Sequence, residues 1–96
     1  MRKKEHVLPI ELFSDLDRSS PVSLYAQLTK IIECEILSGS IPPGTRLENE
    51  LSLGARLSIS RPTIRRAIQE LVNAGLLVRR RGVGTQVVLG RFARNA

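Results

Sequence analysis

The 96-residue sequence has few of the residues that carry most enzyme and metal chemistry. It contains one cysteine, Cys34, and one histidine, His6, which together can form neither an internal disulfide nor a complete zinc site. Only 3% of its residues are aromatic, which argues against a stacking platform for single-stranded nucleic acid. No nucleophile, base and orienting group are recognisable together, so we expect no catalytic residue, no metal and no cofactor.

Long apolar runs are also missing. No stretch approaches the roughly 18 apolar residues of a membrane span. The basic start of the chain is followed by no apolar signal-peptide region. We therefore expect a cytoplasmic protein with no membrane partner. At 42% hydrophobic residues, the chain is large enough for one domain with a single small core.

Charge is distributed unevenly along the chain. The net charge is +6, but residues 1–55 carry a formal charge of −2 and residues 56–96 carry +8. All cations of the second part are arginines, whose planar guanidinium group binds phosphate through two hydrogen bonds at once. Such asymmetry within one small domain indicates a polyanion partner.

Residues 60–75, with the sequence SRPTIRRAIQELVNAG, predict the helix around which the domain is built. The apolar residues fall at i, i+3, i+4 and i+7, which places them on one stripe: Ile64, Ala67, Ile68 and Leu71. Ser60 is a good N-cap, Pro62 suits the first turn, and Gly75 can end the helix. The other face is basic, with Glu70 as its only acid, which is typical of a helix that lies on nucleic acid.

Two earlier helices are expected. The first spans residues 23–38, with an apolar stripe between Pro21 and Gly39. A shorter helix is expected from residue 48 to about residue 57, with Asn49 as its cap and Gly54 allowing another helix to approach closely. A tight turn then leads into the helix at residues 60–75, so the two form a helix-turn-helix.

A glycine-rich loop near the end of the basic part predicts a β-hairpin. Residues 76–81 and 85–89 flank Gly82, Val83 and Gly84, and residues 45–47 could add a short strand. We expect the arginines at positions 79 to 81 to hold a sugar-phosphate backbone, which the glycines can approach closely. An edge hairpin protected from aggregation by its charges remains an alternative.

The first twenty residues show no clear period. Their apolar side chains could dock on the domain or form a short helix, but a loosely held arm is favoured. We therefore expect an N-terminal arm at residues 1–20, a domain at residues 21–89, and a tail or the start of a linker at residues 90–96.

Three helices followed by a hairpin predict an α+β, mostly α fold, namely a winged helix-turn-helix with a two- to three-stranded antiparallel wing. The blocks PVSLYAQL, ILSGSIPPGTRL, SISRPTIRRAIQEL, NAGLL and RRGVGTQV also occur in a specific order and spacing. Over residues 21–89 they resemble the DNA-binding domain of GntR-family bacterial transcriptional regulators. The resemblance implies a repressor or an activator, with a repressor favoured, that binds a short inverted repeat of double-stranded DNA as a homodimer. It also implies a small-molecule effector sensed by a further domain absent from this chain. We therefore expect part of a longer regulator, with a free-standing DNA-binding protein as the alternative.

Family contacts carried over by position, together with neighbouring cations and glycines, give the expected DNA-binding residues. They are Ser60, Arg61, Thr63, Arg65, Arg66, Arg81, Gly82 and Gly84. Leu51 stands where some family members have a DNA-contacting arginine, and Ser58 stands where a turn glycine is common. Ser58 can take the left-handed conformation only at a cost of about 1 kcal/mol or more, so the turn could instead be built slightly differently. A winged-helix protein-protein module and an RNA-binding module remain alternatives.

Overall fold

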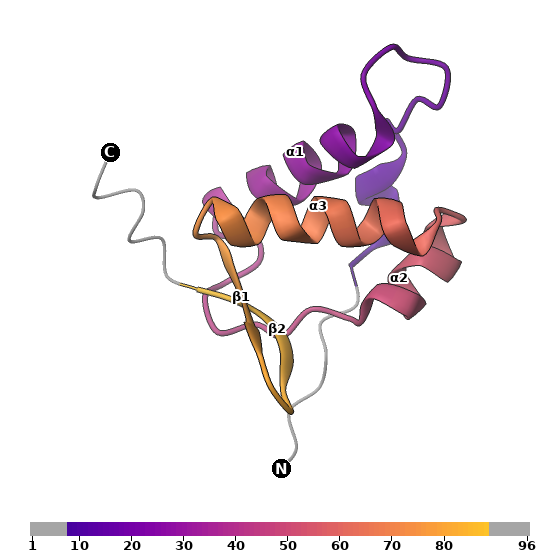
Figure 1. The fold of residues 1–96 in the computed structure, drawn as a ribbon. Coiled ribbons are helices and arrows are strands. Elements are labelled where there is room, and N and C mark those ends of the chain that lie inside the picture. The colour runs from indigo at the N-terminus through magenta and orange to yellow at the C-terminus, as the bar shows by residue number, and fades with distance from the viewer. Residues whose placement is uncertain (1–7, 89–96) are drawn as a thin grey trace.

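The computed structural model describes residues 8–88 as packed helices followed by a β-hairpin (Figure 1). In chain order the elements are the 3-10 helix η1 (Ile10–Phe13), the α-helices α1 (Leu24–Leu37), α2 (Glu50–Leu57) and α3 (Arg61–Asn73), and the strands β1 (Leu77–Arg80) and β2 (Gly84–Val87). These elements confirm the predicted winged helix-turn-helix, an α+β fold that is mostly helical. His6 and the expected tail at residues 90–96 lie outside the described residues.

Capping residues explain where the three α-helices begin and where α3 ends. Ser23, Asn49 and Ser60 each accept a hydrogen bond from the backbone N–H three residues further along. After α3, Gly75 takes the left-handed conformation with φ 82°. Leu76 then donates its backbone N–H to a carbonyl in the last turn of α3 at 3.0 Å. These hydrogen bonds end α3 at the glycine that the sequence indicated.

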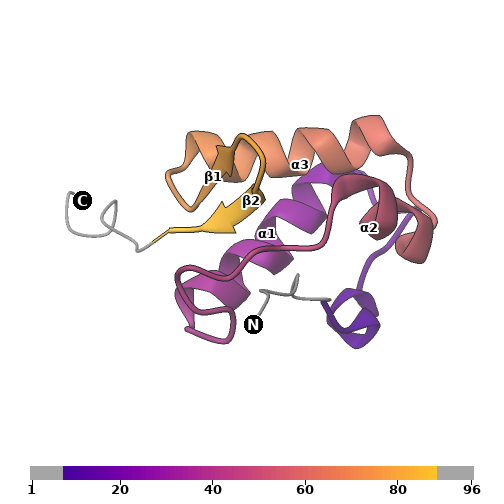
Figure 2. The ribbon, with the colours of Figure 1, turned by 90° about the horizontal axis from the view of Figure 1, so that it is seen from below.

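The apolar stripe of α3 forms the centre of the hydrophobic core. Its members are the residues that the spacing predicted, and all are buried: Ile64, Ala67, Ile68 and Leu71. They belong to one cluster with buried residues of α1, α2 and β1, which include Leu28, Leu53 and Leu77. Helices α1 and α3 lie side by side, and the hairpin extends from the C-terminal end of α3 (Figures 1 and 2). Because one face of α3 is buried, the opposite face is left on the surface.

Strands β1 and β2 form the wing. They pair antiparallel, and the buried residues Leu77 and Val87 lie opposite one another at the end nearest the core. Residues 45–47 run alongside β2, where the backbone N–H of Leu47 donates to the carbonyl of Thr85 at 2.9 Å. The wing is therefore a two-stranded sheet with one bridge to a third segment, within the predicted two to three strands.

The N-terminal segment from residue 8 onward is packed on the domain, which contradicts the favoured interpretation of a loosely held arm. Leu8 is fully buried, and Phe13 of η1 is 5% exposed. The backbone N–H of Leu8 donates to Glu48 Oε1 at 3.0 Å, and Arg56 Nη2 donates to the Leu8 carbonyl at 2.7 Å. Glu48 and Arg56 also form an ion pair at 2.7 Å. Contacts with residues this distant in the sequence outweigh the lack of local periodicity.

The turn between α2 and α3 takes its shape from Ser58 and Gly54. Ser58 is left-handed, with φ 57° and ψ 45°, so the turn has the backbone form that a glycine would allow. Ile59 donates its backbone N–H to the Gly54 carbonyl at 2.9 Å. A Cβ atom on Gly54 would lie 2.9 Å from the Ile59 carbonyl oxygen. The close approach at Gly54 is therefore made by the backbone of the turn and not by another helix, since Ile64 of α3 would lie at an ordinary 3.5 Å from the added Cβ atom. The contact with Ile59 leaves no room for alanine without a backbone shift.

Replacing Ser58 by glycine is expected to raise the free energy of unfolding by about 0.5 to 1 kcal/mol, because glycine takes positive φ without steric cost. The matched control is Ser38→Gly, since Ser38 ends α1 with right-handed geometry. That control should lower stability. Urea denaturation of both variants measures the difference, and an equal loss of stability in the two would contradict strain at Ser58.

Candidate nucleic-acid interface

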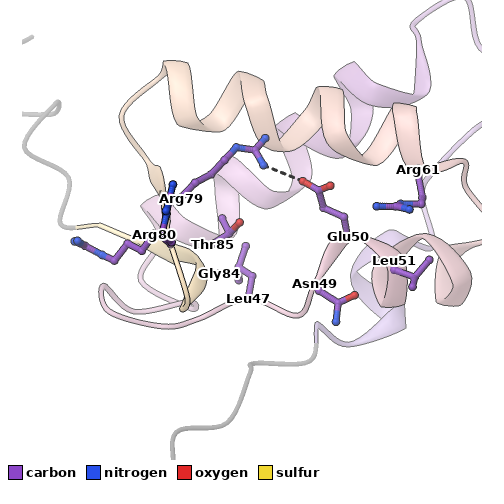
Figure 3. Close-up of a pocket in the computed structure, with 10 residues that line it drawn as sticks. Leu47, Asn49, Glu50, Leu51, Arg61, Arg79, Arg80, Gly84 and Thr85 are labelled. Atoms are coloured by element: carbon purple, nitrogen blue, oxygen red, sulfur yellow. Dashed lines mark hydrogen bonds and ion pairs between the residues drawn. The ribbon is translucent and has the colours of Figure 1, made fainter.

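One hollow on the surface lies between the start of α2, the start of α3 and the wing (Figure 3). Four arginines border it, namely Arg61, Arg79, Arg80 and Arg81. The remaining lining residues come from the start of α2 and from the segments beside it: Leu47, Asn49, Glu50, Leu51, Gly84 and Thr85. We call this surface the basic hollow. It brings Arg61 of α3 and the arginines of the wing onto one surface.

Arg61 and Arg81 are the two arginines best placed to bind an outside anion. Both are exposed, and neither side chain forms an ion pair or a hydrogen bond with another residue between positions 8 and 88. Arg80, which also lines the hollow, instead donates from Nε to Gln86 Oε1 at 2.7 Å. Arg61 occupies the first position of α3, where unpaired backbone N–H groups also favour negative charge. The predicted site residues Arg61, Arg81 and Gly84 therefore meet in the basic hollow.

Ser60 and Thr63 form the N-terminal cap of α3. The Ser60 side chain accepts from the Thr63 backbone N–H at 3.4 Å, and their hydroxyl oxygens lie 2.9 Å apart. Ser60 is exposed and Thr63 is half-buried. Both residues belong to the N-terminal end of α3, as Arg61 does, but neither lines the hollow; each hydroxyl keeps hydrogen-bonding capacity for a ligand.

Glu50 is an acidic residue within the basic hollow, and reasoning from the sequence did not single it out. One of its carboxylate oxygens accepts from Arg65 Nε at 3.3 Å. The other accepts from Arg79 Nη1 at 3.0 Å, a contact that Figure 3 shows. Arg79 also donates to Gln69 Oε1 at 3.3 Å. Glu50 therefore connects α2 with both α3 and β1. It holds Arg79 in the lining of the hollow, whereas Arg65, a predicted site residue, is not among the lining residues.

Arg66 points elsewhere, although the sequence placed it among the DNA-binding candidates. Its guanidinium carbon lies 4.1 Å from the centre of the Tyr25 ring, and Nη2 donates to the Tyr25 hydroxyl at 3.0 Å. Glu70 lies 3.8 Å away on the same helix. Arg66 thus covers the contact between α1 and α3 and is not among the residues that line the hollow. The distant partner Tyr25 gave no signal in the sequence.

Two glycines leave the backbone of the wing accessible. Gly82 has φ 77° in the exposed turn, and a Cβ atom added there would meet no atom within 4 Å. Gly84 has φ 110° and begins β2, whereas the sequence placed it in the loop. Next to them, Arg46 Nη1 donates to the Val83 carbonyl at 3.1 Å and supports the turn. The wing tip can therefore approach a partner through its main chain.

Other features that would suggest different chemistry are absent from residues 8–88. No helix there is long and apolar enough to pass through a membrane. No three histidine, cysteine, aspartate or glutamate side chains there are grouped to hold a metal ion. Cys34 is an exposed free thiol on α1.

The fold and the basic hollow define a winged helix-turn-helix protein. Residues 24–87 match the family model described as bacterial regulatory proteins, gntR family. The chain belongs to this family, which confirms the resemblance seen in the sequence. Its members are regulatory proteins, in agreement with the expectation that the chain is not an enzyme.

The chain is similar in sequence to part of the length of known relatives. The chain is 48% identical over 67 residues to the histidine utilization repressor of Pseudomonas aeruginosa, a match that covers 70% of this chain and 27% of that protein. It is 36% identical over 73 residues to the transcriptional repressor NagR of Bacillus subtilis, covering 76% of this chain and 30% of NagR. The chain thus spans less than a third of the length of these relatives.

Solved structures share the architecture. AraR(DBD) in complex with an operator is 34% identical, with a TM-score of 0.66, and the match covers 88% of this chain and all of that one. YtrA from Sulfolobus acidocaldarius, a GntR-family transcription factor, has a TM-score of 0.74 at 23% identity over 84% of this chain and 85% of YtrA. The second likeness shows the fold alone.

Replacing Glu50 by glutamine is expected to lower the free energy of unfolding by about 1 to 2 kcal/mol, because two charge-assisted hydrogen bonds weaken at a carboxylate only 18% exposed. Glu70→Gln is the matched control, since its single contact is longer and 44% of the side chain is exposed. It should change stability by less than about 0.5 kcal/mol. Chemical denaturation that gives equal losses would show that Glu50 does not join the elements.

Proposed function

We propose that this domain binds double-stranded DNA of specific sequence and that the protein regulates transcription, as a repressor. The observation that carries the proposal is the convergence of Arg61 with the wing arginines 79 to 81 on one exposed surface. The named relatives that are repressors, and the AraR(DBD) structure with an operator, support the same function.

The first turn of α3 is the part that reads bases. Its apolar stripe holds the helix on the core, and Arg61 stands at the exposed end. The major groove of DNA admits a helix, and an arginine there can bond to O6 and N7 of guanine together. Thr63, two residues further along the same turn, reaches a thymine methyl group or a phosphate, and Ser60 reaches a phosphate.

The wing binds the neighbouring minor groove or backbone. Backbone N–H groups at Gly82 and Gly84 approach the phosphates, and Arg81 adds charge. Arg65 exchanges part of its contact with Glu50 for a phosphate. The proposed contacts are Ser60, Arg61, Thr63, Arg65, Arg81, Gly82 and Gly84. Arg66 is the weakest of the candidates, because its stacking on Tyr25 limits it to a phosphate at the flank.

The full regulator is proposed to bind an inverted repeat as a homodimer, since a two-fold operator matches a two-fold protein. Residues 21–89 then form the DNA-binding domain, extended by the packed segment from residue 8, and residues 90–96 begin a tail or linker. A small-molecule effector would act through a domain outside this chain, because the relatives are more than three times as long as the matched part. The site of action is the cytoplasm, where its DNA partner is found.

Binding to duplex DNA is expected to weaken with salt. If the four arginines at positions 65, 79, 80 and 81 neutralise phosphates while Arg61 binds a base, log affinity should fall against log salt with a slope of about −3 to −4. Arg81→Ala should make the slope less steep by about 1. Lys30→Ala, an exposed change on α1 outside the hollow, should leave it unchanged. Fluorescence anisotropy measures these slopes, and a wild-type slope near zero would refute the proposal.

Arg61→Ala is expected to cost roughly 1 to 3 kcal/mol of binding to a selected operator and much less on random duplex DNA, because it removes a base contact. Arg66→Ala is the matched control on the same helix and should cost less than Arg61→Ala on the operator. Equal losses on both DNAs would show that Arg61 only holds phosphate. Duplex RNA should bind weakly, since its narrow major groove excludes a helix; equal affinity for RNA would favour an RNA-binding module.

A further inference from the structure

Leu51 is an exposed apolar residue in the hollow that four arginines and Glu50 also line. It lies in the first turn of α2 and is 61% exposed, more than any other large hydrophobic side chain reported for residues 8–88. In Figure 3 it stands below Arg61 at the end of the hollow nearest the helix-turn-helix. Its side chain therefore lines the same hollow as the arginine proposed to read a guanine.

The core does not require a leucine at this position. Leu53 and Leu57 of the same helix are 1% and 7% exposed and supply the packing of α2. Leu51 points away from them, and leaving a leucine in water gives up the free energy that burial would provide. A partner that enters the hollow would bury Leu51 and recover this free energy.

The chemistry of a duplex restricts what this contact can be. A leucine has no hydrogen-bonding group, so it can neither hold a phosphate nor read a donor or acceptor on a base. Among the base edges in the major groove, the C5-methyl group of thymine is the apolar feature. Arg61, which lines the same hollow, brings this part of the surface to the major groove in the proposed mode of binding.

We propose that Leu51 is a specificity-determining residue, which contacts the C5-methyl group of a thymine near the base bound by Arg61. This rests on the proposed function, because it needs α3 in the major groove. Each half-site then carries one thymine whose methyl group, and not only its base pairing, contributes to affinity. The start of α2 thus adds a base contact to those of α3 and the wing.

Substitution of deoxyuridine for thymidine tests the proposal, since it removes the methyl group alone. An operator is first selected from random duplex DNA with the full chain, and each thymidine of a half-site is then replaced in turn. At one position, wild-type protein should bind about four-fold more weakly, the factor for burying one methyl group. Leu51→Ala should bind the thymidine and deoxyuridine forms of that position equally.

Two controls separate loss of the contact between Leu51 and a thymine methyl group from loss of protein stability or of electrostatic binding. Leu37→Ala removes another leucine, 55% exposed at the end of α1 and outside the hollow, and should keep the full preference for thymidine. Leu51→Ala removes no charge and no core residue, so its thermal midpoint and salt slope should match those of the wild type.

The outcomes distinguish this inference from the function on which it rests. If Leu51→Ala retains the four-fold preference, or if no thymine position shows one, the contact with a methyl group is refuted while DNA binding stands. If selection enriches no sequence and duplex DNA does not bind, the proposed function fails and Leu51 loses its role with it.

Discussion

Burial of one stripe of α3 is the constraint on which the rest of the structure depends. Ile64, Ala67, Ile68 and Leu71 fix how the helix is rotated on α1, α2 and β1. Once that rotation is fixed, the polar first turn and its arginines must face outward. The same packing sets where the chain leaves α3 at Gly75, and so it places the wing beside the helix. A hydrophobic constraint thereby positions a charged surface.

Glu50 adds a polar constraint to the apolar one. Its carboxylate binds arginines from α3 and from the wing, so three elements are joined at the edge of the basic hollow. A single acid among many cations limits the repulsion between them and restricts their rotamers. Arg61 and Arg81, which it does not contact, are left to bind an anion, so restrained and unrestrained arginines stand side by side on one surface.

The parts predicted from sequence are those determined by local rules. Helix periodicity placed the stripe of α3, capping rules placed its ends, and glycines placed the wing. Pairs distant in the chain were not predictable in this way. The docking of Leu8 depends on Glu48 and Arg56, forty or more residues away, and Arg66 turns toward Tyr25 on another helix. Neither partnership leaves a periodic signal in the sequence, because each forms only after the elements have packed.

DNA is proposed to bind the surface formed by the start of α3 and the wing. Backbone amide NMR signals of the labelled chain, followed during titration with a selected operator duplex, locate that surface residue by residue. The largest shifts are expected at residues 49–51, 60–65 and 79–85. Shifts concentrated instead on the outer face of α1, around Lys30 and Glu33, with the basic hollow unchanged, would contradict this proposal.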